Sequence, residues 1–183
     1  MLNEKWNMTQ EISCRIEHAR SVFTRMKKVL SNRSLPLELR IKMVRCYVFP
    51  VMLYGMEGWT LTQRLEEKIE AFEMWVYRRL LRISWRDRVR NEDVLVRLHA
   101  DKTLLTAVKT RKLEYFAHVM RNKKYHLLHL IIQGKIEGRR SVGRRRTSWL
   151  ANLRKWYHMN THTLFRAAAS KVKTVMMIAN LQP

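Results

Sequence analysis

The sequence predicts an all-α protein. Apolar residues recur at spacings of three and four along almost the whole chain, as they do on the buried face of a helix. Glycine and proline are rare, at 5 and 3 of 183 residues, so few positions interrupt regular structure. Hydrophobic residues make up 46% of the chain, which excludes a disordered basic tail. We therefore expect a basic bundle of about six to eight helices with one Gly/Arg-rich loop.

Two helices are expected in the first third of the chain. The first begins near Thr9 and ends near Asn32. Its apolar face consists of Ile12, Ile16, Ala19, Phe23, Met26 and Leu30. Ser34 is expected to cap the second helix, with Pro36 in the first turn. The inward residues of that helix would be Ile41, Val44, Val48 and Val51. Pro50 should kink or end it, because proline lacks the N–H that an internal helix position donates.

A third, long helix is expected to begin after Thr62. Its apolar residues repeat at three and four positions and are Leu65, Ile69, Phe72, Val76, Leu80 and Ile83. Its other side is acidic at first and basic later, an order that complements the helix macrodipole. The acidic residues are Glu66, Glu67, Glu70 and Glu73, and the basic ones are Arg78, Arg79 and Arg82. We interpret the glutamates as one solvated face rather than a metal site, because they are spaced as neighbours on a helix surface.

The next segments are shorter. Asn91 and the acidic pair behind it start a short helix, and residues 103–121 form another with Leu105, Val108, Phe116 and Val119 inward. Residues 125–133 are apolar enough for a short buried helix or a strand, and periodicity does not separate the two.

A basic loop interrupts the last part of the chain. Residues 134–147, GKIEGRRSVGRRRT, hold three of the five glycines and six basic residues, so we expect a flexible loop. A helical stripe follows it, formed by Trp149, Leu150, Leu153 and Trp156. A final helix over 163–181 would pack through Phe165, Ala168, Val172, Met176 and Ala179.

The positive charge is concentrated in the second part of the chain. The formal charge of the whole chain is +22. Residues 1–73 contain 12 basic and 9 acidic residues, a net of +3, whereas residues 74–183 contain 25 and 6, a net of +19. We divide the chain into a helical region at 1–100 and a basic C-terminal helical region at 101–183. A field of this sign attracts polyanions, with nucleic acid the first candidate and anionic membrane the second.

The sequence offers no catalytic, metal or cofactor site. Two-metal polymerases and nucleases need clustered carboxylates, and the three aspartates at 87, 93 and 101 are isolated. His126 and His129 have the spacing of a helical ligand pair but lack further ligands nearby, so ordinary histidines are favoured. Cys14 and Cys46 form no CxxC pair, which favours an intracellular compartment. No apolar run approaches the roughly 20 residues that span a bilayer, so no membrane partner is expected.

Two basic segments are the candidate phosphate contacts. The first lies in the loop and comprises Lys135, Arg139, Arg140, Arg144, Arg145 and Arg146. The second comprises Arg78, Arg79, Arg82, Arg86, Arg88 and Arg90. Arginine presents a planar fork of donors suited to phosphate. The loop is also compatible with a nuclear localisation signal or a merely solvated segment. Trp149 could stack on a base, but its spacing with Leu153 and Trp156 favours core packing.

Three blocks of the sequence carry a family resemblance. They are YGMEGWTL at 54–61, FEMWVYRRLLRISW at 72–85 and GRRSVGRRRTSWL at 138–150. In this order they resemble the segment after the catalytic palm in reverse transcriptases of non-LTR (LINE-type) retrotransposons, and most of all the craniofacial development protein 2-like endonuclease–reverse transcriptases. The resemblance extends from about residue 12 to residue 181. Gly58 and Ala117 depart from it, since the family commonly has Thr and Gly there.

The resemblance implies that residues 1–100 are thumb-like and that the palm domain, with its paired aspartates, is absent. It implies binding of RNA, DNA or their hybrid through phosphates, with no enzymatic activity from the chain alone. Two alternatives stay open: part of an RNA-directed DNA polymerase that needs its palm, and a helical protein-interaction fragment or non-functional relic. Without a palm, Tyr47, Phe49, Met52 and Tyr54 should be less covered than their neighbours, which favours contact with a palm or self-association. We expect a nuclear rather than a cytoplasmic location.

Overall fold

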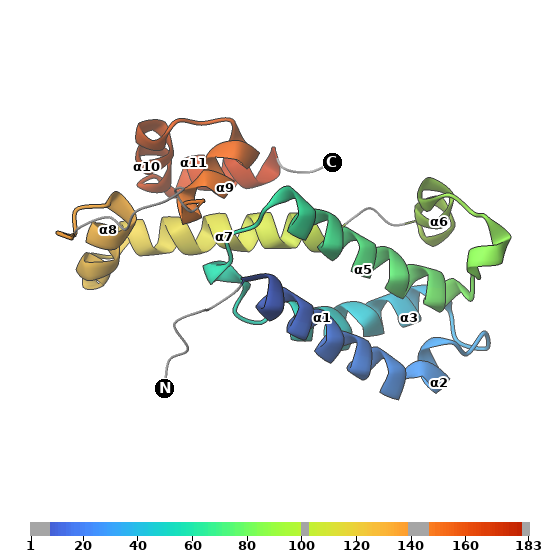
Figure 1. The fold of residues 1–183 in the computed structure, drawn as a ribbon. Coiled ribbons are helices and arrows are strands. Elements are labelled where there is room, and N and C mark those ends of the chain that lie inside the picture. The colour runs from blue at the N-terminus through green and yellow to red at the C-terminus, as the bar shows by residue number, and fades with distance from the viewer. Residues whose placement is uncertain (1–7, 100–102, 139–146, 181–183) are drawn as a thin grey trace. The chain divides into compact units, whose positions relative to one another are not determined.

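The fold is all-helical, as the sequence predicts. A computed structural model describes residues 8–99, 103–138 and 147–180, and these contain no strand (Figure 1). Eleven α-helices lie in the described ranges. The number exceeds the six to eight expected because the first, second and last expected helices are each divided in two.

The chain divides into two compact units, and the second unit includes a short piece of chain from within the first. The first unit comprises Met1–Met56 and Leu61–Leu105, and the second comprises Glu57–Thr60 and Thr106–Pro183. The first contains α1 (Met8–Arg25), α2 (Lys27–Leu30), α3 (Leu37–Met43), a π-helical turn (Val44–Val48), α4 (Phe49–Met52), α5 (Gln63–Leu81) and α6 (Asn91–Leu98). The second contains nearly all of α7 (Leu104–Arg121), then α8 (His126–Gln133), α9 (Trp149–Tyr157), α10 (Thr161–Ala168) and α11 (Lys171–Ala179). Single 3-10 turns lie at Met56–Gly58, Trp85–Asp87 and Lys123–Tyr125.

The second expected helix begins later than predicted. Pro36 is the N-cap of α3, with φ −53° and ψ 140°, and Ser34 lies outside the helix. The α conformation is disfavoured for a residue that directly precedes a proline, so Leu35 does not join the helix and α3 begins only after Pro36. Ser34 instead donates from its backbone N–H and its hydroxyl to Asn32 Oδ1, at 3.0 and 2.8 Å.

Pro50 interrupts the helix without ending it. The π-helical turn lies directly before α4, in which Pro50 occupies an early position. A wider turn there accommodates a residue that has no N–H and whose ring crowds the preceding turn. The extra residue in the turn rotates the buried face, so that Phe49 and Met52 are buried while Val51 is half-buried.

The expected exposure of four apolar residues near Pro50 is only half confirmed, because of this rotation. Tyr47 and Tyr54 are largely exposed, at 58% and 69%, as predicted. Phe49 and Met52 are buried in the first unit, so the prediction of poor cover is wrong for these two.

The core of the first unit forms where α1 packs against α4 and α5. Figure 1 shows α1 alongside α5. The predicted inner face of α1 is confirmed, since Ile12, Ile16, Ala19 and Phe23 are all buried. Thr62 occupies the N-cap position of α5, as predicted, in an extended conformation, but its side chain makes no capping hydrogen bond. The buried stripe of α5 includes Leu65, Ile69, Phe72, Val76 and Leu80.

The second unit has its own core around α7. The core residues are Leu113, Phe116, Ala117, Leu153, Leu164, Ala167, Ala168 and Met177. The last expected helix is divided into α10 and α11, because the Ser170 hydroxyl accepts from the Lys173 N–H at 3.4 Å and starts a new helix. The break rotates the buried face, so Val172 and Met176 are largely exposed rather than packed as predicted.

Residues 126–133 form the helix α8, which resolves the choice between helix and strand. The expected burial is wrong, because no residue of α8 is buried and Leu127 and Ile131 are 65% and 51% exposed. An apolar composition alone does not bury a helix that follows a turn at the end of α7.

Candidate nucleic-acid interface

The C-terminal end of α5 carries a basic groove, here named the α5 groove. Its cations are Lys27, Arg78, Arg79 and Arg82, its aromatic walls include Trp75 and Trp85, and its volume is about 650 Å³. No carboxylate lies among its described lining residues. Three of the arginines proposed from sequence therefore lie together, joined by Lys27 from α2, which the sequence analysis missed.

The backbone turns sharply at this end of α5. Arg82 is the C-cap residue and adopts the left-handed conformation, with φ 58°. The Ile83 N–H donates to the Arg78 carbonyl at 2.8 Å and closes the helix end. A non-glycine residue is uncommon in this region, and the turn carries the arginine side chain outward at the point where α5 stops.

Arg78 holds the segment that follows the turn. Its Nη2 donates to the Val89 carbonyl at 2.7 Å and to Asn91 Oδ1 at 2.9 Å. The guanidinium thus ties the end of α5 to the start of α6. Arg79 and Arg82 are exposed, and they are the arginines of α5 best placed to meet a ligand.

Trp75 anchors the groove on the core of the first unit. Its ring stacks on Phe72 with centroids 6.0 Å apart and meets the edge of Phe23 at 5.3 Å. The Arg79 guanidinium lies 4.4 Å from the indole centroid and that of Arg20 lies 5.2 Å away. Cations over an indole face are attracted by the ring quadrupole, so Trp75 steadies Arg79.

Arg40 secures the same end of α5 from inside. It is buried, and its Nη1 donates to the Leu80 carbonyl at 3.0 Å and to the Leu30 carbonyl at 3.3 Å. Carbonyls in the last turn of a helix have no partner within the helix, so a buried guanidinium supplies one.

The remaining candidate residues are placed only in part. Arg86 is exposed on the 3-10 turn, and Lys135 is exposed after α8. The arginines at 139, 140 and 144–146 lie outside the described residues. Trp149 packs in the second unit, where its Nε1 donates to the Glu57 carbonyl at 2.8 Å and its ring lies 6.1 Å from Phe116. The preference for core packing of Trp149 is confirmed.

Glu73 corrects the interpretation of the glutamates as one solvated face. It is fully buried, and its Oε1 accepts from the Tyr77 hydroxyl, the Thr103 N–H and hydroxyl and the Leu104 N–H, at 2.9 to 3.1 Å. Burial raises the pKa of Glu73, and these four hydrogen bonds oppose the rise. The carboxylate caps the N-terminus of α7 from α5, a structural task that the helical spacing of the glutamates did not reveal.

A second buried charge, Lys112, lies in the second unit. Its Nζ donates to the Trp59 carbonyl and to Asn152 Oδ1, the latter at 3.0 Å. It also lies 4.7 Å from the Trp149 ring centroid and 5.5 Å from that of Trp156. Burial lowers the pKa of Lys112 from 10.5 to about 7. Sequence reasoning missed this lysine because one charge inside an apolar stripe gives no distinct signal.

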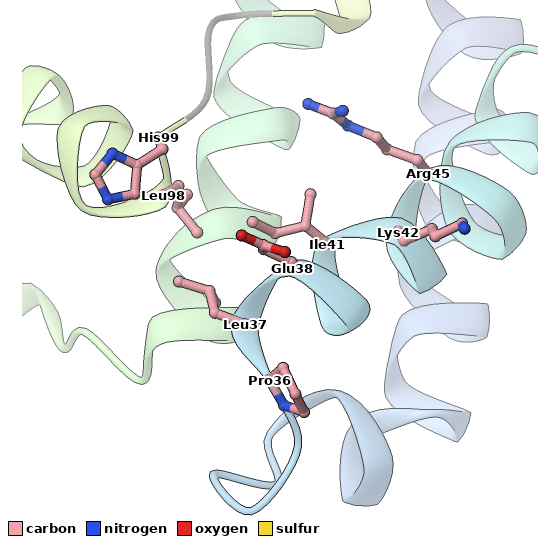
Figure 2. Close-up of a pocket in the computed structure, with 8 residues that line it drawn as sticks. All are labelled: Pro36, Leu37, Glu38, Ile41, Lys42, Arg45, Leu98 and His99. Carbon is pink, nitrogen blue, oxygen red and sulfur yellow. The ribbon is translucent and has the colours of Figure 1, made fainter.

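Another cavity of the first unit, of about 690 Å³, is less suited to a polyanion (Figure 2). Pro36, Leu37, Ile41 and Leu98 give it apolar walls, and Glu38 places a carboxylate among the cations Lys42 and Arg45. Figure 2 shows that these side chains come from α3, the π-helical turn and the end of α6.

Two of the described histidines have ordinary packing and hydrogen-bonding partners. His129 is held by its ring nitrogen at 2.6 Å from the Val119 carbonyl, and His118 packs against the Tyr125 ring. Over the described ranges, no group of three or more His, Cys, Asp or Glu residues could hold a metal ion. Nor does any helix in the described part of the chain have the length and apolarity needed to cross a membrane.

Comparison with known proteins gives one informative similarity. The chain is 29% identical over 159 residues to an uncharacterized transposon-derived protein of Caenorhabditis elegans. The match covers 84% of this chain and 56% of that protein, so the chain spans little more than half of its relative. This similarity supports a transposon-related origin. No protein-family model and no solved structure matches the chain.

Proposed function

We propose that the chain binds RNA, DNA or their hybrid through phosphate contacts and without strong sequence preference. The α5 groove carries this proposal, because Lys27, Arg79 and Arg82 gather there and no carboxylate lies among its described lining residues. Such a set of cations neutralises phosphates, and phosphates are the same in every sequence. The formal charge of +22 adds a field that attracts any polyanion.

The sequence resemblance leads to a finer reading of the same function, and the transposon-derived relative agrees with the transposon origin that this reading implies. We propose that the chain corresponds to the thumb and C-terminal region of a non-LTR retrotransposon reverse transcriptase, and that it is not an enzyme by itself. The motif blocks at 54–61, 72–85 and 138–150 carry this resemblance. A polymerase would need a cluster of carboxylates for two metal ions, which the described residues do not contain.

Salt dependence tests the binding. We expect the affinity for a labelled RNA–DNA hybrid, measured by fluorescence anisotropy, to fall by about 10³-fold or more between 50 and 200 mM salt if about six phosphates are contacted. R79A and R82A should each reduce the salt slope by about 1. R64A is the matched control, because Arg64 is exposed at the opposite end of the same helix. Affinity that does not respond to salt would contradict the proposal.

Alanine substitution of the five arginines at 139, 140 and 144–146 tests the basic loop in the same assay. We expect a loss of affinity and a smaller salt slope, because each guanidinium that meets a phosphate releases a counterion. An unchanged affinity would assign the binding to the α5 groove alone.

The second candidate function is a part of an RNA-directed DNA polymerase, which the sequence blocks at 54–61, 72–85 and 138–150 favour through their resemblance to reverse transcriptases. Primer extension should then be absent from the purified chain and appear when a separately expressed palm fragment is added. Extension by the chain alone would contradict the non-enzymatic reading. The absence of rescue over a wide range of palm concentrations would leave only the binding module.

A further inference from the structure

The 3-10 turn after α5 displays a tryptophan to solvent. Trp85 is 83% exposed, while every other tryptophan in the described part of the chain is buried or half-buried. A large aromatic ring is seldom left this exposed unless a partner covers it, because its burial is strongly favourable. Exposed rings of this kind are typical of binding surfaces.

Local hydrogen bonds order the backbone of the turn that carries Trp85. Ser84 and Asp87 form a capping box, in which the Ser84 N–H donates to Asp87 Oδ2 at 2.7 Å and the Arg86 N–H donates to Ser84 Oγ at 3.4 Å. Arg78 fixes the far end of the same segment through the Val89 carbonyl. The ring is therefore presented by a pre-ordered support, which reduces the entropy lost when a ligand stacks on it.

The surroundings of Trp85 are cationic. The Arg86 guanidinium lies 5.7 Å from the indole centroid. Lys27, Arg79 and Arg82 line the groove at whose edge Trp85 lies. An indole beside a row of cations is the combination that single-strand binding proteins use, in which bases stack on aromatic rings while cations follow the backbone.

The kind of nucleic acid that Trp85 can bind follows from the need for its indole to reach the face of a base. Inside a duplex the faces of the bases are covered by neighbouring base pairs, so away from the duplex ends an indole reaches a base face only where the strand is unpaired. Stacking requires no particular base, since every base has a π face. We propose that Trp85 is a stacking platform for an unpaired base and that the α5 groove binds single-stranded nucleic acid, with Lys27, Arg79 and Arg82 on the phosphates next to that base.

This inference rests on the proposed nucleic-acid binding, and it adds a preference for unpaired strands. The test compares W85L and W85F in the full chain, using a labelled single-stranded 12-mer of uridine or thymidine and a blunt duplex of equal length. W85L keeps an apolar side chain without a π face, and W85F keeps a smaller ring. V96A is the control, since Val96 is 70% exposed on α6 of the same unit.

We expect W85L to weaken binding of the single strand by about 5- to 150-fold, the range for one stacked base. W85F should retain most of the affinity, V96A all of it, and the duplex affinity should change less than twofold in every variant. The salt slope should be unchanged, because no cation is removed. Circular dichroism at 222 nm checks that each variant keeps its helices.

Two results would overturn the inference. An equal loss for single strand and duplex would show that Trp85 contacts only the backbone. Unchanged affinity for the single strand would show that no base stacks there, and loss of self-association in W85L by sedimentation would then assign the ring to a protein contact. If the wild-type chain binds neither probe in a salt-sensitive way, the proposed function itself fails, which is a different outcome from failure of the stacking platform.

Discussion

Replacing Lys112 by methionine tests the strongest electrostatic feature of the second unit. Methionine keeps the length and apolarity of the lysine stem and removes the ammonium that the Trp59 carbonyl and Asn152 Oδ1 accept from. The pKa of Lys112 is about 7 in the folded chain, against an ordinary value of 10.5. Between these two pH values the unfolded chain binds more protons than the folded one, so the stability of the wild type rises with pH.

The size of this effect follows from the two pKa values. A difference of one bound proton between the unfolded and the folded chain changes the free energy of unfolding by about 1.36 kcal/mol for each pH unit. Through Lys112, the free energy of unfolding of the wild type should therefore rise by about 3 kcal/mol between pH 7 and pH 9.5. K112M should gain none of this. At pH 7 the variant is relieved of the burial of a charge but leaves two acceptors unpaired at about 1–3 kcal/mol each, so the two chains should differ little.

Urea unfolding followed by circular dichroism at pH 7, 8 and 9.5 measures the difference between K112M and the wild type. The range stops at 9.5 because burial raises the pKa of Tyr77 and Tyr157 above the usual value of 10, so both contribute pH dependence at higher pH. K135M is the matched control, since Lys135 is exposed, and it should keep the wild-type pH dependence. A difference between K112M and the wild type that stays constant with pH would refute the reasoning. It would mean that the two hydrogen-bond acceptors and the two nearby indole rings stabilise the charged ammonium enough to offset the cost of burying it.

Two further predictions concern buried polar residues of the first unit. The raised pKa of Glu73 means that above pH 4.5 the folded chain binds more protons than the unfolded chain, so the stability of the wild type should fall as the pH rises. E73Q should not show this fall, because glutamine does not titrate. Thermal melts of both chains between pH 4 and 8 measure the difference, and parallel curves would argue against it. R40M should lower the free energy of unfolding by about 2–4 kcal/mol, because the Leu30 and Leu80 carbonyls lose their buried donor. Urea unfolding measures this loss, with R64M as the control. An equally small effect of both substitutions would show that Arg40 is dispensable.

The sequence predicts helices well wherever one buried face repeats without interruption. The inner face of α1, the start of α5 after Thr62 and the stripe of α7 could all be predicted, because each depends on local spacing alone. The divisions at Pro50 and Ser170 change the buried face, since one altered turn rotates every residue after it.

The candidate site could be predicted only in part for a different reason. Arginines at helical spacing along α5 are visible in the sequence, whereas the contribution of Lys27 depends on how α2 packs beside the end of α5. Trp85 gives no signal, because a single aromatic residue beyond the end of an apolar stripe is equally compatible with a buried position. The burial of Glu73 depends on the start of α7, some thirty residues further along the chain.

The discontinuous second unit has a consequence for the order in which the chain folds. The Trp59 carbonyl that meets Lys112 is 53 residues away from it, and the Glu57 carbonyl that meets Trp149 is 92 residues away. During synthesis Glu57–Thr60 leaves the ribosome long before α7 and α9 exist, and it must wait for both. Local helices form early, whereas contacts of this sequence separation close large loops and form late. The second unit should therefore complete its polar core only after α9 has been synthesised, although each of its helices can form from local contacts.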